Sequence, residues 1–134
     1  MSGAEAMWAA DVASKALGME CEDAAPGTAR VSMVVRDDMV NGHGICHGGL
    51  VAALADSTFA LACNGYGEMT VAAGFDITFL APARRGDTLV AVAVERARAG
   101  KSGLYDVTVR RRSDAAVIAE FRGRSREVGR VSAP

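Results

Sequence analysis

The chain has 134 residues, a formal net charge of −1, 50% hydrophobic and 23% charged residues. This length fits one domain over residues 1–134, which buries roughly two-thirds of its unfolded surface and needs no disulfide or metal to hold its core. The hydrophobic content excludes a disordered or collagen-like chain. The near-zero charge argues against a nucleic-acid binder, and no apolar run reaches the roughly 18 residues of a membrane span.

Charge is divided unevenly along the chain, because residues 1–80 carry a net −7 and residues 81–134 a net +6. A basic second half indicates either a localised anionic ligand or solvated strand faces, and both interpretations stay open.

The cysteines and the N-terminus predict the compartment. Cys21, Cys46 and Cys63 cannot all pair and form no CxxC motif, which favours a reducing environment. The first residues lack the basic and apolar regions of a signal peptide. We therefore expect a cytoplasmic protein.

In chain order, the pattern predicts a helix, two strands, one long helix and four strands. The first helix covers residues 4–17 and ends at Gly18. Residues 47–63 are rich in Ala and Leu without alternation, which favours a second helix capped by Asn64-Gly65. Alternating or turn-bounded segments predict strands over residues 19–23, 28–36, 70–80, 88–97, 104–112 and 115–127, with a loose tail at 128–134.

These elements predict an α+β fold. Consecutive hairpin-connected strands make a mainly antiparallel sheet. A helix that is apolar almost all round must be covered on most sides. One antiparallel sheet wrapped around the central helix meets this need in part, and we expect a second subunit to close the remainder.

Both histidines of the chain lie in one glycine-rich loop, Asn41-Gly42-His43-Gly44-Ile45-Cys46-His47-Gly48-Gly49. The long helix begins where this loop ends, so free N–H groups and the positive end of the helix dipole lie near residues 47–50. Such a place binds an anion or a carbonyl oxygen that becomes negative; the alternative is a tight turn into a packed helix. His43, Cys46 and His47 offer metal ligands, but no fourth ligand follows at structural-zinc spacing. No Gly-Lys-Ser/Thr opens the helix, so the loop is not a P-loop.

Asp56 is the candidate for acid–base or nucleophilic chemistry. It lies in the middle of the long helix among alanines, Leu54 and Phe59. A buried carboxylate is costly unless it is paired or used, and apolar surroundings raise its pKa. The alternative is an aspartate hydrogen-bonded for structure at a subunit contact.

Helix geometry relates Asp56 to the loop. Gly48 and Asp56 lie about 12 Å apart along the axis and roughly 80° around it. The two groups therefore cannot easily reach one carbonyl carbon from the same helix. Two helices side by side about a twofold axis could pair Gly48 of one chain with Asp56 of the other.

The residues quoted above, with four further segments, resemble the hotdog-fold acyl-CoA thioesterases, and among them the phenylacetic acid degradation thioesterases. The likeness covers nearly the whole chain in order. Its further segments are Ile77-Thr78-Phe79-Leu80-Ala81-Pro82, Gly86-Asp87-Thr88-Leu89, Gly100-Lys101-Ser102-Gly103-Leu104-Tyr105-Asp106-Val107 and Phe121-Arg122-Gly123-Arg124-Ser125.

The resemblance implies a hotdog fold and hydrolysis of an aryl- or arylacetyl-CoA to the free acid and CoA. Asp56 matches the catalytic carboxylate and Gly48 the N–H that polarises the thioester carbonyl, with His47 and Asn41 lining the site. The implied substrate contacts are Gly49, Phe59 and, toward CoA, Lys101, Ser102 and Gly103. The resemblance also implies a dimer of dimers and no metal or prosthetic group.

The sequence departs from the family at Ala81, where members often carry a basic residue. Arg84 and Arg85 are the candidates to supply that charge. Two other functions stay open: a hotdog acyl-CoA hydratase that uses His47, and a non-catalytic acyl-CoA-binding module.

Overall fold

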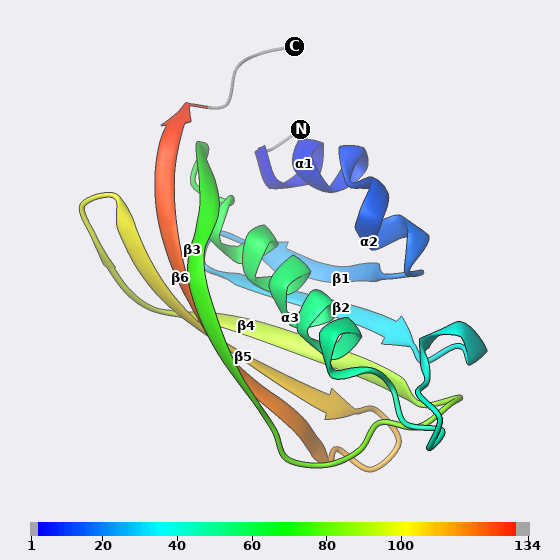
Figure 1. Cartoon of the computed structure of the whole chain (residues 1–134). Coiled ribbons are helices and arrows are strands. Elements are labelled where there is room, and N and C mark those ends of the chain that lie inside the picture. The colour runs from blue at the N-terminus through cyan, green and yellow to red at the C-terminus, as the bar shows by residue number, and fades with distance from the viewer. Residues whose placement is uncertain (1–2, 131–134) are drawn as a thin grey trace.

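The computed structural model describes residues 3–130, which form one antiparallel sheet wrapped around a long helix (Figure 1). The helices are α1 (Gly3–Ala10), α2 (Val12–Ala16) and α3 (Gly48–Cys63), with a 3₁₀ turn, η1 (Asp37–Met39). The strands are β1 (Glu20–Ala25), β2 (Thr28–Val34), β3 (Glu68–Phe79), β4 (Thr88–Ala99), β5 (Ser102–Arg111) and β6 (Val117–Arg130). The predicted α+β architecture is confirmed.

The strand order is β1-β2-β4-β5-β6-β3, and every neighbouring pair is antiparallel. β1 and β3 are therefore the edges of the sheet. Because α3 connects β2 with the far edge strand β3, it must pass across the concave face. α3 has 16 residues, and no helix within residues 3–130 is long and apolar enough to cross a membrane.

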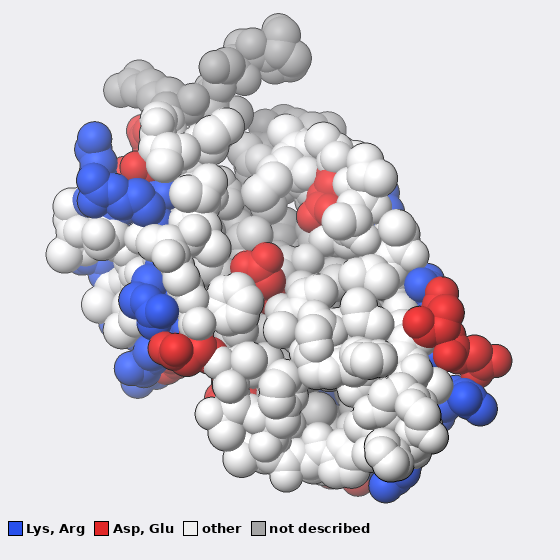
Figure 2. Space-filling view, viewed as in Figure 1, with Lys and Arg blue, Asp and Glu red and all other residues white. Residues whose placement is uncertain are grey.

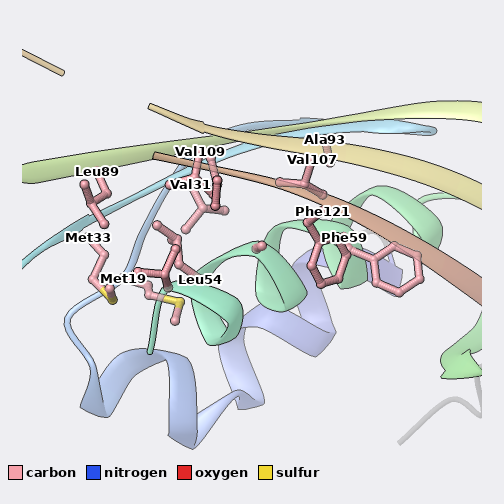
Figure 3. Close-up of a cluster of buried hydrophobic side chains, with 14 of the residues drawn as sticks. Met19, Val31, Met33, Leu54, Phe59, Leu89, Ala93, Val107, Val109 and Phe121 are labelled. Atoms are coloured by element: carbon pink, nitrogen blue, oxygen red, sulfur yellow. The ribbon is translucent and has the colours of Figure 1, made fainter. Parts of the chain in front are cut away.

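The core lies between α3 and the sheet (Figure 3). Leu54 of α3 is fully buried, and Leu89, Ala91 and Ala93 of β4 point toward the helix with no exposed surface. Val92 alternates with them and is 40% exposed on the outer face. Small strand residues let α3 pack closely on the sheet, as the alanine-rich and valine-rich composition suggests.

The prediction of one N-terminal helix over residues 4–17 is wrong in one respect, because the structure has two helices there, separated at Asp11. Asp11 has an extended conformation (φ −77°, ψ 99°), and its Oδ1 accepts a hydrogen bond from the N–H of Ser14 at 2.8 Å. An aspartate in this position caps a new helix. The result is α1 and α2 with a change of direction between them (Figure 1).

The predicted loose tail is also wrong over residues 128–130. β6 continues to Arg130 because β3 begins at Glu68 and supplies a partner, with Gly129 opposite Met69. Pairing with another strand decides this boundary, and the local sequence alone does not indicate it. Residues 131–134 of the predicted tail lie outside the described residues.

The inner face of β3 is only partly covered. The alternation of Phe75, Ile77 and Phe79 predicts a buried face, yet Phe75 is 42% and Phe79 50% exposed. β3 is an edge strand, and α3 covers it less completely than it covers the centre of the sheet. Met69 and Val71 are also half exposed, so this edge presents a large apolar surface.

Candidate active site

The glycine-rich loop is held in place by hydrogen bonds at both ends. The Oδ1 atom of Asn41 accepts from the N–H groups of His43 (2.8 Å) and Ile45 (3.2 Å). The N–H of Cys46 donates to the carbonyl of Ala83 at 2.8 Å, which ties the loop to the segment before β4. The start of α3 is therefore fixed relative to the β3–β4 connection.

The first N–H groups of α3 are free. His47 is the N-cap residue, and its carbonyl accepts from the N–H groups of Leu50 (2.9 Å) and Val51 (3.2 Å). Within residues 3–130, the N–H groups of Gly48 and Gly49 have no acceptor. Unpaired donors at the positive end of a helix dipole are suited to an oxygen that gains negative charge.

A pocket of about 410 Å³ opens beside these donors. Its walls include Asn41, Gly48, Phe79 and Leu80, together with Val51 from the next turn of α3. Gly48 must be a glycine for the ring of Phe79 to lie where it does, because a Cβ at this position would be 2.8 Å from Cζ of Phe79. The pocket thus combines an apolar wall with free N–H groups.

Asp56 lies farther along α3, half-buried, and is the one charged residue of this helix. Its carboxylate makes no hydrogen bond or ion pair with any residue that the structure describes. Burial raises the pKa of Asp56, and the negative charge of Asp11 raises it further. Figure 2 shows small, separate acidic patches within the largely uncharged middle of the face that carries α3.

Asp56 does not reach the pocket beside Gly48 in the same chain, since it is absent from the pocket's walls. Both residues lie on α3, eight positions apart, with the separation along the axis expected for a helix. One chain therefore presents the donor and the carboxylate at two different places.

Comparison with known proteins decides the family. The family profile described as thioesterase superfamily matches residues 43–118, more than half of the chain and all of α3. The chain belongs to the thioesterase superfamily. In keeping with this family and with its relatives, it is a thioester hydrolase of the hotdog fold.

Two similar proteins illustrate the relationship. The chain is 42% identical to the acyl-coenzyme A thioesterase PaaI of Escherichia coli K12, over 94% of this chain and 89% of that protein. The solved structure of the E. coli PaaI protein from the phenylacetic acid degradation operon superposes with a TM-score of 0.93 and 40% identity, covering 96% of this chain and 93% of that one. The TT0310 protein of Thermus thermophilus matches with a TM-score of 0.83 and 36% identity, covering 88% of this chain and 98% of that one.

In this hotdog hydrolase, Asn41 and Gly48 line the same pocket, and Gly49 follows Gly48 in the first turn of α3. The other predicted site residues lie elsewhere. His47 and His43 are exposed and Cys46 is buried, and residues 3–130 hold no cluster of three or more His, Cys, Asp or Glu suited to a metal. Phe59 does not line the pocket. It is 1% exposed and packs against Tyr105 and Phe121, with ring centroids 5.4 and 5.8 Å away. Its contact with substrate stays a prediction.

The basic residues expected to bind CoA lie at opposite ends of β4. Arg84 and Arg85 precede this strand, and the hairpin with Lys101 follows it, so the two groups are separated by about 40 Å along the strand at the usual rise per residue. Arg85 forms an exposed ion pair with Asp37 at 3.0 Å. Within one chain the two groups cannot serve the same phosphate.

The arginines of the strands mostly have acidic partners. Asp106 pairs with both Arg96 (3.3 Å) and Arg122 (2.7 Å), and Arg124 pairs with Asp76 at 2.9 Å. For these strands the structure favours the interpretation of the basic residues as part of a solvated, charge-balanced surface, rather than as a site for an anionic ligand. Arg84 forms no ion pair with the described residues and is the better candidate for an anionic ligand.

Sequence reasoning missed one group near Asp56. Asp11, Ser14 and Ser57 form a row of hydrogen bonds between α2 and α3. The spacing Asp-x-x-Ser at residues 11–14 is an N-cap signal that could have revealed the first part of this row. The contact with Ser57, 43 residues farther along the chain, has no local signal.

Proposed function

We propose that the protein hydrolyses aryl- or arylacetyl-CoA thioesters, giving the free acid and CoA. The observation that carries the proposal is the combination, on one helix, of unpaired N–H groups at Gly48 and a half-buried carboxylate at Asp56 without a partner in the described chain. The similar E. coli protein is named an acyl-coenzyme A thioesterase, and its solved structure is linked to phenylacetic acid degradation. These names support the acyl-CoA class and favour an arylacetyl group.

In the proposed reaction, the thioester carbonyl oxygen accepts a hydrogen bond from the N–H of Gly48. Asp56 then either attacks the carbonyl carbon, forming an acyl-aspartyl anhydride that water hydrolyses, or removes a proton from the water that attacks. On either route the negative oxygen collapses, the C–S bond breaks and CoA leaves as the thiolate. The Asn41 amide lies in the wall of the same pocket, where it can contact the acyl group or the carbonyl.

We further propose that each site is completed by a second copy of the chain. The β3 edge carries unpaired backbone groups and half-exposed Met69, Val71, Phe75 and Phe79. Pairing of two β3 edges about a twofold axis would cover these side chains and place two α3 helices side by side. Gly48 of one chain then approaches Asp56 of the other, and two such dimers form the proposed tetramer.

Release of thiol from a panel of acyl-CoAs tests this function. We expect turnover of phenylacetyl-CoA or hydroxyphenylacetyl-CoA, and a loss of about 10²–10⁴ in rate for Asp56→Asn, which keeps the shape but removes the base. The matched control is Asp23→Asn, an exposed carboxylate on β1. Rapid chemical quench with mass analysis distinguishes an acyl-aspartyl intermediate from direct attack by water.

Three outcomes would contradict the proposed reaction. Hydration of an enoyl-CoA without thiol release would indicate a hydratase, and binding without turnover would indicate a binding module. Turnover by Asp56→Asn at the wild-type rate would remove Asp56 from the mechanism.

A further inference from the structure

α2 is fastened to α3 by two serine hydroxyl groups directly beside Asp56. Oγ of Ser14, a residue that is 2% exposed, lies 2.7 Å from Oγ of Ser57. The same Ser14 Oγ lies 2.7 Å from Oδ2 of Asp11, and the Ser14 N–H donates to Oδ1 at 2.8 Å. Since Ser57 follows Asp56 in α3, a continuous row of hydrogen bonds connects the acidic N-cap of α2 with the turn that carries Asp56.

The number of available protons fixes the direction of this row. An ionised Asp11 carboxylate can only accept, so the hydroxyl proton of Ser14 goes to Asp11. Ser14 Oγ can then only accept from Ser57, whose own proton points toward α2. The Ser57 proton is therefore committed and does not hydrogen-bond the neighbouring Asp56.

We propose that Asp11, Ser14 and Ser57 are positioning residues for the reaction: they hold a second negative charge near Asp56 and direct the adjacent hydroxyl proton away from it. Asp56 is thereby kept free to attack or to accept a proton. The inference rests on the proposed function of Asp56 as nucleophile or base.

The electrostatics of the helix agree with this geometry. The charge of Asp11 adds to burial in raising the pKa of Asp56. On α3 itself, burial, with a smaller contribution from the charge of Asp56, raises the pKa of the Cys63 thiol to about 12. The Cys63 thiol therefore stays neutral and adds no charge near Asp56. Glu5 of α1 and Lys15 of α2 are exposed, and the sheet beneath α3 faces the helix with the apolar side chains of the core. Asp11 is thus the charged neighbour that acts on Asp56.

Asp11→Asn tests the inference, because it removes the charge while asparagine remains a good N-cap and keeps an acceptor oxygen. We expect the acid limb of the kcat/KM profile for phenylacetyl-CoA to move to lower pH, with KM unchanged on the plateau. At a pH on the wild-type acid limb, the variant should retain a larger fraction of its own maximum than the wild type does. Asp23→Asn, an exposed change on β1, should leave the profile in place.

Variants of Ser57 test the hydrogen-bonded row itself. Ser57→Ala removes the contact that fastens α2 to α3. It should let the Asp11 charge move away from Asp56 and shift the acid limb in the same direction, whereas Ser57→Thr keeps the hydroxyl and should restore the wild-type profile. An acid limb that stays at the wild-type pH in a folded Asp11→Asn protein would overturn the inference.

A second readout separates this inference from the proposed function. The pH titration of the Asp56 carboxyl carbon, followed by ¹³C NMR in wild type and in Asp11→Asn, does not depend on activity. A lower titration midpoint in Asp11→Asn supports the coupling even if no acyl-CoA is hydrolysed, and an unchanged midpoint refutes it even if thioesterase activity is found.

Discussion

Replacing Gly48 by proline removes the N–H that we assign to the thioester oxygen while leaving the start of α3 intact. Gly48 is the first residue of the helix, where proline is well tolerated. His47 before it has φ −55° and ψ 133°, a conformation that a following proline favours. The new Cβ would lie 2.8 Å from Cζ of Phe79, but this ring is 50% exposed and can move aside. Loss of one such donor should lower kcat by about 10²–10³.

Mixing Gly48→Pro chains with Asp56→Asn chains then tests the shared site. If each site takes Gly48 from one chain and Asp56 from the other, every mixed dimer has one intact site and one site with both defects. Random reassortment of equal amounts makes about half of the dimers mixed, so activity should return to about a quarter of the wild-type value. Thiol release from phenylacetyl-CoA measures it, and tandem purification with two different tags isolates the mixed dimer.

The control is Gly48→Ala, which introduces the same Cβ against Phe79 but keeps the N–H. It separates the effect of the steric contact from the loss of the donor. Two inactive parents that give an inactive mixture, with mixed dimers demonstrated by native mass spectrometry, would refute a site built from two chains. Every chain would then carry one defect in its own site.

Two predictions concern charge. Arg84→Gln should raise KM for acyl-CoA and flatten the salt dependence of KM, with little change in kcat. The rise in KM should be larger than for Arg85→Gln, because Arg85 already pairs with Asp37. Steady-state kinetics at several salt concentrations measure both variants. Asp56→Asn should raise the melting temperature at pH 7 although it lowers the rate of turnover by about 10²–10⁴. The raised pKa of Asp56 means that the folded state binds the proton more tightly than the unfolded state, so stability falls as pH rises from the ordinary value of 3.8 through the folded pKa. Calorimetry should find that the advantage of Asn shrinks as pH is lowered toward 4, and an advantage independent of pH would contradict the assignment.

Much of the fold could be predicted from the sequence because its signals are local. The alanine-rich segment without alternation forms α3, and the alternation in β2 gives the buried face observed. Boundaries that depend on a distant partner could not be predicted. β6 extends to Arg130 because β3 begins at Glu68, and the row from Asp11 to Ser57 depends on α2 packing on α3.

The candidate site shows the same division. The free N–H groups follow from the glycine-rich loop and the start of a helix, both visible in the sequence. The burial of Phe59 in the core, away from the pocket, could not be predicted from the sequence. A phenylalanine on an apolar helix can face either the core or a ligand. The positions of Arg84 and Lys101 relative to each other follow only once β4 is known to be continuous between them.

The proposed division of the site between two chains has a physical reason in the geometry of α3. Its first turn must supply the N–H groups, because only there are they free of internal hydrogen bonds. A carboxylate in that first turn would compete with the substrate oxygen for the same donors. Asp56 avoids this competition because it lies about two turns later, where α2 rather than the loop determines its surroundings. In each chain the loop therefore sets the position of the N–H donor, and Asp11 independently influences the pKa of the Asp56 carboxylate. We expect a second copy of the chain to bring the donor of one chain to the carboxylate of the other.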